Sequence, residues 1–467
     1  MAYCWSWSER PDDLAVAVFA HRAIARGHEV SLTDNGYSGP DALTAAAALC
    51  TLSGGSGKAT GPSLRLPRIV LYTGDAIGYP YYAYYAHALW SLGLAYRRAS
   101  AAQIAKGILD HAEVLIIPGG FATWGLDRIE EVAGVDHAIR EFITRGGACI
   151  GSCGGAFYLS EGRPGWLNAI DAKPRFTHEY LLTGTCLLNV RLSDPALRRG
   201  LPETLELPYY HGPVYDIAER GSATLATFGE HVLSNRLFID NPIDATRYGD
   251  IMRNRVAILS GRTPAHRVIA FSAHPEMGEF LRKAMVLDGY VRHYLPLRGA
   301  KTMQETLRFY AKEDCVAFRL ILNAAIILGA FNGEPGPQEE LEIAPGASIS
   351  DINDIHDIHD INAIDVAWRE GLADLRARLP TDEEAGIAAL IEMELATLAT
   401  EWQDLCVSLK ERTGDQELQL TLSDAASAIS SPVPRSCPEA MVLLELPVRL
   451  LAARSRMTRF DSILEMA

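Results

Sequence analysis

A cysteine between glycines is the residue of this sequence best suited to covalent chemistry. Cys153 stands in Gly151-Ser152-Cys153-Gly154-Gly155, directly after a short apolar run and before the apolar stretch Ala156–Leu159. A sharp strand-to-helix turn requires small neighbours, and it presents its central side chain at a helix N-terminus that favours a thiolate. The pattern predicts a nucleophile at Cys153, whereas Cys149, four residues earlier, is expected to pack in the core.

A histidine and a glutamate follow a later apolar run. They stand in Phe271-Ser272-Ala273-His274-Pro275-Glu276. Parallel α/β sheets gather their sites at the carboxyl ends of strands, and a nucleophilic cysteine needs a base that a third group orients. We therefore predict a catalytic triad of Cys153, His274 and Glu276. The alternative for His274 is a surface histidine without a catalytic role.

Chemistry at a carbonyl group also requires donors for the developing oxyanion. The turn Pro118-Gly119-Gly120 ends another apolar run. We expect the backbone N–H groups of Gly119 or Gly120, together with that of Gly154, to bind the oxyanion. Phe121 and Tyr210 are candidates for the substrate pocket, and the alternative for both is ordinary packing.

The elements that must position these residues alternate between short apolar strands and helices. Expected strands in the first half are 69–72, 94–97, 114–117 and 148–151. Strands that are apolar on both faces indicate a parallel sheet covered by helices on both sides. From residue 181 to 274 the pattern becomes β-rich, and helices return from 278. The sequence predicts an α/β fold with a doubly wound, mostly parallel, flavodoxin-like sheet, a nucleophile elbow, a β-rich insertion and a helical C-terminal extension.

Four regions are expected along the chain. They are a helical N-terminal extension and linker (1–62), the site-bearing domain (63–332), an acidic low-complexity linker (333–361) and a helical C-terminal extension (362–467). The Gly/Ser run 53–58 superficially resembles a phosphate loop, but Leu52 stands where that loop needs glycine, so a linker is expected. His356 and His359, in the repeat DINDIHDIHD, suggest metal binding, but a solvated acidic connector is the favoured interpretation.

Bulk composition excludes some classes of function. The chain has 467 residues and a formal net charge of −15, which argues against nucleic acid or an anionic membrane as the main partner. No apolar stretch reaches the roughly 18–20 residues of a membrane span, and the N-terminus shows no secretory signal. Eight cysteines without a CxxC pair fit reduced thiols and a cytoplasmic protein. No metal or cofactor is expected.

Taken together, the Pro-Gly-Gly turn, the cysteine elbow and the His274-Pro275-Glu276 ending resemble the class I glutamine amidotransferase-like superfamily, in the same order and with similar spacing. The resemblance covers about residues 68–331 and implies that Cys153, His274 and Glu276 are nucleophile, base and acid. Within the superfamily, Tyr209-Tyr210-His211-Gly212-Pro213-Val214-Tyr215 resembles a Tyr-rich motif of the branch that includes the N-terminal domain of biotin–protein ligases. No biotinyl-adenylate signature and no nucleotide-binding synthetase segment accompany it.

These observations predict a cysteine hydrolase or amidotransferase-like enzyme that cleaves a C–N amide or related acyl bond through a thioester. Its partners would be a small amide or acyl substrate and a separate synthetase or acyl acceptor, and the helical tail would serve docking or oligomerisation. Two alternatives stay open. One is an enzyme of the intracellular-protease-like branch, against which the His-Pro-Glu ending counts. The other is a non-catalytic interaction or scaffold protein.

Overall fold

The structure is a computed structural model that describes most of the chain. The described residues are 2–6, 13–52, 54–57, 61–120, 124–216, 221–263, 265–293, 316–332, 361–379, 385–409 and 415–466. Phe121 and the repeat with His356 and His359 lie outside them, so the roles expected for these residues stay predictions.

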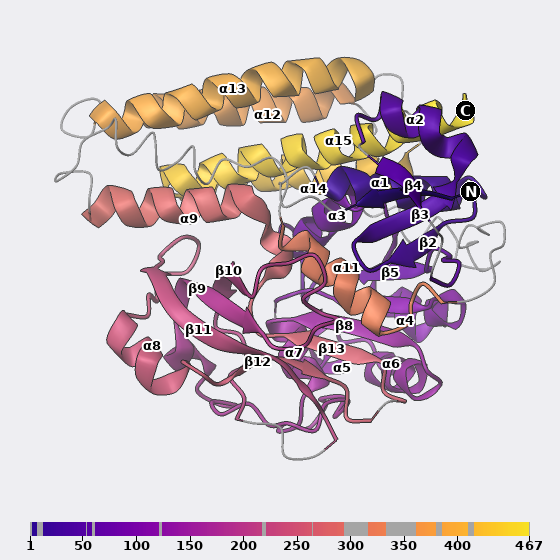
Figure 1. Ribbon diagram of the computed structural model, residues 1–467. Coiled ribbons are helices and arrows are strands. Elements are labelled where there is room, and N and C mark those ends of the chain that lie inside the picture. Colours follow the sequence, from indigo (N-terminus) through magenta and orange to yellow (C-terminus); the bar gives the residue numbers. More distant parts are fainter. Residues whose placement is uncertain are drawn as a thin grey trace.

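A nine-stranded sheet forms the centre of the molecule, in the order β10-β9-β11-β12-β13-β8-β7-β5-β6 (Figure 1). Five strands pair in parallel, and their bounds are β5 (Ile69–Tyr72), β6 (Arg97–Ala99), β7 (Val114–Ile117), β8 (Ala148–Ser152) and β13 (Val268–Phe271). All residues of β5, β7, β8 and β13 are buried, as the apolar runs predict. The expected α/β fold is therefore confirmed.

The β-rich insertion extends this same sheet. Its antiparallel strands are β9 (Thr185–Leu192), β10 (Thr204–Tyr210), β11 (Thr224–Ser234) and β12 (Val256–Ser260). β12 pairs with β13, so the insertion joins the sheet next to the strand that precedes His274. Although β10 is the edge strand of the insertion, the His274 N–H donates to the carbonyl of Pro208 at 2.9 Å, so the end of β10, with Tyr210, lies against the end of β13.

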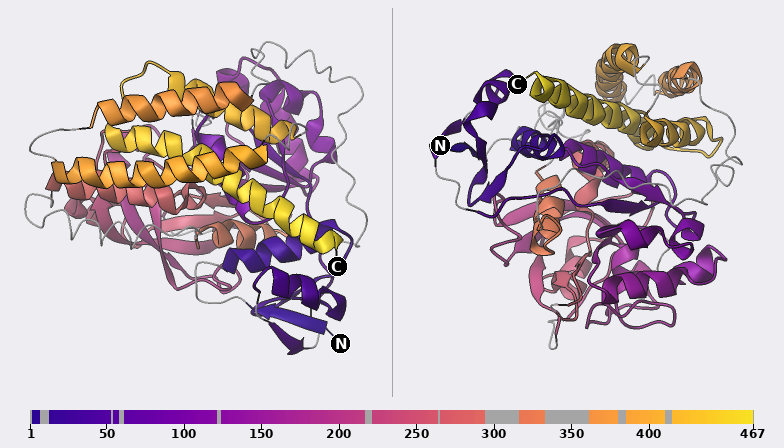
Figure 2. Two further views of the ribbon diagram at one scale, coloured as in Figure 1. Left: turned by 90° about the horizontal axis from the view of Figure 1, so that it is seen from above. Right: turned by 90° about the vertical axis from the view of Figure 1, so that its right-hand side faces the viewer.

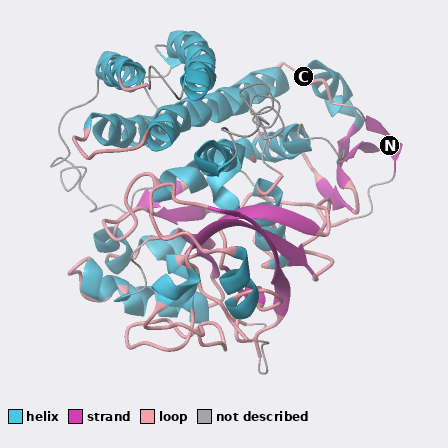
Figure 3. Ribbon diagram, turned by 90° about the vertical axis from the view of Figure 1, so that its left-hand side faces the viewer, coloured by secondary structure: helices cyan, strands magenta, loops and turns pink. Residues whose placement is uncertain are grey.

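Helices cover the sheet on two sides, as Figures 1 and 3 show. On the side toward the C-terminal helices lie α3 (Tyr81–Ser91), α9 (Gly278–His293) and α11 (Phe318–Ile327). On the other side lie α5 (Leu126–Ile129), α6 (Val135–Thr144) and α7 (Gly154–Leu159). The short helices α4 (Ala101–Ala105) and α8 (Ala245–Ile251) complete this domain.

The N-terminal segment is not only helical, and this corrects the expectation from sequence. Besides α1 (Asp13–Ala25) and α2 (Thr44–Leu49), it holds an antiparallel sheet in the order β2-β3-β1-β4. The bounds are β1 (Ala2–Ser6), β2 (Ser31–Thr33), β3 (Gly36–Pro40) and β4 (Gly54–Gly57). β4 is the Gly/Ser run expected as a linker, and it pairs with β1 through backbone hydrogen bonds, for which glycine suffices.

The C-terminal extension is helical, as predicted. It consists of α12 (Ile361–Ala377), α13 (Ala385–Leu409), α14 (Gln416–Ser430) and α15 (Cys437–Glu465). α15 packs on α1, α3 and α9, and α12 and α13 lie outside it, whereas α14 reaches Tyr82 and Arg98 of the site-bearing domain through Asp424 (Figures 1 and 2). Within the described ranges, no helix has both the length and the apolar content needed to cross a membrane.

Candidate active site

The strand β8 ends in a tight turn at Cys153, and α7 begins at the next residue. Cys153 has φ 47° and ψ −105°, a backbone conformation that costs energy for a residue with a side chain. A Cβ atom on Gly154 would lie 2.2 Å from the carbonyl oxygen of Gly120, and one on Gly155 would lie 2.1 Å from that of Ile117. Only glycine fits at both positions. The close contact also places the Gly119-Gly120 turn directly against the start of α7.

His274 and Glu276 lie at the same edge of the sheet as Cys153. The parallel pairing of β13 with β8 places Phe271 opposite Ser152, so both chains leave the sheet side by side. The Cys153 N–H donates to the carbonyl of Phe271 at 2.9 Å. A Cβ atom on Gly119 would lie 2.7 Å from His274 Cε1 and 3.3 Å from Cys153 Cβ. These contacts bring the three residues expected as a triad together, with the glycine turn between base and nucleophile.

The histidine and the glutamate form a buried ion pair. Nδ1 of His274 and Oε1 of Glu276 are 2.7 Å apart, and both side chains are at most 2% exposed. Burial lowers the pKa of His274, but the negative charges of Glu276 and of a Cys153 thiolate outweigh it and raise the pKa to about 10. The imidazolium is therefore the favoured form whenever Cys153 is a thiolate. Hydrogen bonds from the imidazole to Glu276 and to Cys153 add to this rise in the pKa.

The thiol of Cys153 donates a hydrogen bond to a backbone oxygen. Its Sγ atom lies 3.0 Å from the carbonyl oxygen of Tyr210. The Tyr210 ring packs edge-on against His274 with 5.9 Å between ring centroids, and its hydroxyl accepts from Asn235 Nδ2 at 3.0 Å. Tyr210, predicted as a substrate-binding residue, thus touches both the nucleophile and the base. It is only 7% exposed, so this arrangement favours a role in shaping the site.

Two hydroxyl groups beside the triad were not singled out from sequence. Ser152 Oγ donates to Glu276 Oε2 at 3.2 Å, and the hydroxyls of Ser152 and Tyr85 are hydrogen-bonded to each other. All three side chains are buried. Ser152 belongs to the cysteine elbow and Tyr85 to a run of tyrosines, but 124 residues separate Ser152 from Glu276. No local sequence pattern indicates that pairing.

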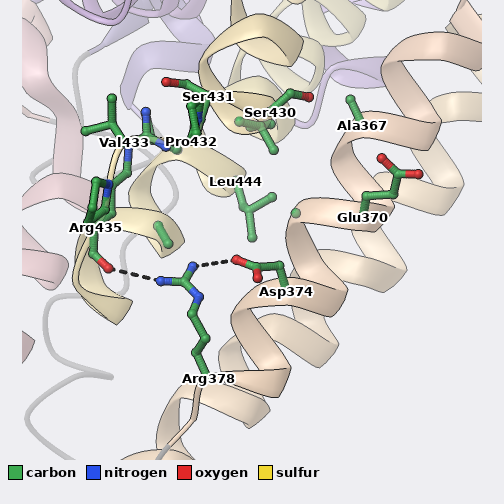
Figure 4. A pocket seen from close by; sticks show the side chains of 15 residues that line it. Ala367, Glu370, Asp374, Arg378, Ser430, Ser431, Pro432, Val433, Arg435 and Leu444 are labelled. Atoms are coloured by element: carbon green, nitrogen blue, oxygen red, sulfur yellow. Dashed lines mark hydrogen bonds and ion pairs between the residues drawn. The ribbon is translucent and has the colours of Figure 1, made fainter.

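In the part of the chain that the structure describes, neither a metal site nor the hollow found in the C-terminal extension coincides with this cluster. Among the described residues, no group of three His, Cys, Asp or Glu side chains is arranged to hold a metal ion. A hollow of about 460 Å³ lies in the tail, between α12, the α14–α15 connection and α15 (Figure 4). Arg378 and Asp374 pair at its edge at 2.9 Å. None of its lining residues belongs to the cluster around Cys153, so this hollow is not the pocket of that site.

Comparison with known proteins agrees with the fold and the elbow. Residues 87–165 match the CobB/CobQ-like glutamine amidotransferase domain. The chain therefore carries a domain of the class I glutamine amidotransferase-like superfamily. Within that class, the matched family is the CobB/CobQ-like one, and the match includes Gly119, Gly120 and Cys153 but ends before His274. A comparison with curated proteins finds no match.

Solved structures show only distant likeness. A glutamine amidotransferase from Thermotoga maritima is 12% identical, with 56% of this chain and 99% of that chain covered and a TM-score of 0.34. PurLQS from Thermotoga maritima is 16% identical, with coverages of 45% and 88% and a TM-score of 0.28. A glutamine amidotransferase from Methylobacillus flagellatus is 14% identical, with coverages of 59% and 98% and a TM-score of 0.32.

Proposed function

We propose that the protein is a cysteine-nucleophile amidotransferase or hydrolase that cleaves a C–N amide bond, with glutamine as the first substrate to test. The observation that carries the proposal is the buried His274–Glu276 pair, 2.7 Å apart, at the strand edge where the strained Cys153 turn lies. A cysteine at a helix start, beside a protonated imidazole, has the surroundings that favour a thiolate. The family match at residues 87–165 supports the same chemistry.

The proposed reaction begins when the thiol turns from the Tyr210 carbonyl and passes its proton to Nε2 of neutral His274, which gives a thiolate–imidazolium pair. The thiolate of Cys153 attacks the amide carbonyl, and a C–S bond forms while the carbonyl π electrons move to oxygen. Backbone N–H groups of Gly119 or Gly120 and of Gly154 stabilise this oxyanion. Imidazolium Nε2 then gives its proton to the leaving nitrogen as the C–N bond breaks, which releases ammonia and leaves a thioester.

Hydrolysis of the thioester reverses these roles. Neutral His274 takes a proton from water, the hydroxide adds to the thioester carbonyl, and the C–S bond breaks to give a carboxylic acid and the cysteine. Glu276 keeps Nδ1 protonated, so that Nε2 is the atom that exchanges protons. In an amidotransferase the released ammonia passes to an acceptor, and we propose that a separate synthetase chain or acyl acceptor supplies it. Since Cys153 reacts only as a reduced thiol, we place the protein in the cytoplasm.

The test is ammonia release from glutamine by the purified chain. Cys153→Ala should abolish release, whereas Cys149→Ala is the matched control because Cys149 is buried and burial raises the pKa of its thiol. If glutamine yields no ammonia, a panel of primary amides and thioesters should be assayed next. Equal turnover by the wild type and Cys153→Ala would overturn the proposal. The likeness to the biotin–protein ligase branch stays a prediction.

A further inference from the structure

We infer that Ser152 and Tyr85 are positioning residues that act on the triad through Glu276, an inference that rests on the proposed function. A carboxylate that orients a histidine has two oxygen atoms, and only one of them faces the imidazole. Oε1 of Glu276 meets His274 Nδ1 at 2.7 Å. The other oxygen, Oε2, accepts the Ser152 hydroxyl at 3.2 Å. Both oxygens therefore have a donor, and the carboxylate cannot rotate without losing one of them.

The direction of the hydrogen bonds follows from the chemistry of the groups. A carboxylate only accepts, so the Ser152 proton points to Glu276 and the Ser152 oxygen is left to accept a hydrogen bond from the Tyr85 hydroxyl. Burial and the charge of Glu276 raise the pKa of Tyr85 well above its usual value, so Tyr85 keeps the proton that it donates. Tyr85 thus donates to Ser152 and Ser152 donates to Glu276, whose other oxygen accepts a hydrogen bond from His274 Nδ1.

The positions of Tyr85 and Ser152 in the fold give these hydrogen bonds a role beyond local packing. Ser152 is the last residue of β8 and directly precedes the nucleophile, so one residue of the elbow binds the acid of the triad. Tyr85 lies on α3, and Tyr82 of the same helix donates to Asp424 of α14 in the C-terminal extension. The hydrogen bonds of Tyr85 and Ser152 thus connect the triad to α3, which in turn is bonded to the C-terminal extension through Asp424.

A matched control pair exists elsewhere in the same domain. Ser160 and Tyr215 are also fully buried, and their hydroxyls are 2.6 Å apart. Ser160 donates to the carbonyl of Ala156 at 2.7 Å and accepts from the Tyr215 hydroxyl, which also lies 3.3 Å from that carbonyl; among the described residues, no hydrogen bond links this pair to the triad. Removal of either pair deletes the same chemical groups from an equally dry environment. Only the first pair should change the behaviour of Cys153.

The experiment measures the alkylation rate of Cys153 by iodoacetamide across pH, with peptide mapping, in the full chain. In Ser152→Ala the imidazolium loses an oriented counter-ion, so the thiolate–imidazolium pair forms less readily. We expect the acid limb of the profile to move to higher pH and the rate at pH 7 to fall about tenfold, the loss typical of one hydrogen bond to a charged group. Tyr85→Phe should act in the same direction but less strongly.

The double variant Ser152→Ala/Tyr85→Phe should be no slower than Ser152→Ala alone, because Tyr85 acts through Ser152. Ser160→Ala and Tyr215→Phe should leave the profile unchanged, even where they lower the melting temperature. A Ser152→Ala profile that overlays the wild type, or losses that add in the double variant, would overturn the inference. Should Ser152→Ala not fold, Tyr85→Phe is the variant that tests the inference. An unchanged alkylation profile in Tyr85→Phe would then overturn the positioning role.

These outcomes distinguish the positioning role of Ser152 and Tyr85 from the proposed function, because alkylation needs no substrate. If wild-type Cys153 reacts no faster than the partly exposed Cys406, the proposed function itself is contradicted. If Cys153 reacts fast and the Ser152→Ala profile is unchanged, only the positioning role of Ser152 and Tyr85 is contradicted. Ammonia release gives a second readout, in which a positioning role lowers kcat more than it changes KM.

Discussion

At the scale of single residues, the site depends on one buried charge pair. His274 carries a pKa of about 10 only because Glu276 and the thiolate of Cys153 outweigh the cost of burial. Removal of the carboxylate therefore leaves a buried imidazole that is easily neutralised, as at His87, where burial and the charges of Arg449 and Arg456 lower the pKa to about 3. The two histidines show that the neighbouring charge, and not burial alone, sets the protonation state.

The pair should make folding stability depend on pH. The pKa of His274 is raised in the folded state, so its contribution is complete below about pH 6.5 and is lost as the pH rises through about 10. Over that interval the loss is at most about 1.4 kcal/mol per pH unit. In Glu276→Gln the loss of folding stability with rising pH should be smaller, because His274 no longer has the carboxylate that raises its pKa. Urea midpoints at pH 6.5, 8 and 10 measure this, and parallel declines in both proteins would contradict it.

At the scale of elements, glycines decide how closely the elbow and the oxyanion turn approach. Gly155 of α7 and Gly249 of α8 are both helical, but they differ in their surroundings. A Cβ atom on Gly155 would lie 2.1 Å from the Ile117 carbonyl oxygen, whereas one on Gly249 would meet nothing within 4 Å. The same substitution should therefore have opposite effects at the two positions.

Gly155→Ala should destabilise the protein by about 1–3 kcal/mol, as overpacking usually does, and should displace the turn at Gly119. Gly249→Ala should stabilise it by roughly 0.4–1 kcal/mol, since alanine lowers the entropy of the unfolded chain. Thermal and urea unfolding of both variants measure the difference. A Gly155→Ala protein as stable and as active as Gly249→Ala would show that the close packing of the elbow is unimportant.

Sequence patterns predict the central elements well and the peripheral ones poorly. The strands β5, β7, β8 and β13 are continuous apolar runs, so their burial in a parallel sheet was predictable. The strand β4 consists of glycine and serine alone, and only its pairing with β1 makes it a strand. The link between Ser152 and Glu276 escapes sequence analysis for the same reason, because it depends on a contact across 124 residues.

At the scale of the whole molecule, the C-terminal extension is anchored to the site-bearing domain by buried charges. Lys283 of α9 is 4% exposed and lies 2.7 Å from Glu394 of α13 and 3.4 Å from Glu445 of α15. Burial raises the pKa of Glu445, but the charges of Lys283 and Arg449 outweigh it and lower the pKa overall. The ammonium group of Lys283, shared by Glu394 and Glu445, thus joins α9 to two helices of the extension.

Lys283→Met should therefore destabilise the full chain by up to about 3–5 kcal/mol, because Glu394 loses its cation and Glu445 keeps only Arg449. Arg236→Met is the control, since Arg236 and Asp240 form an exposed pair 2.7 Å apart and its loss should cost less than about 1 kcal/mol. Urea unfolding followed by tryptophan fluorescence reports on both parts of the chain. Equal losses in the two variants would contradict the anchoring role of Lys283.

The proposed chemistry depends most on a covalent intermediate at Cys153, and acid-quenched mass spectrometry tests this directly. The protein is mixed with glutamine, quenched within the first turnovers, digested and searched for acylated cysteine. We predict a glutamyl group on the peptide that contains Cys153, which hydroxylamine removes as expected for a thioester and which is absent in Cys153→Ala. Ammonia release that continues in Cys153→Ala, or turnover with the acyl group on another residue, would contradict the assignment of Cys153 as the nucleophile.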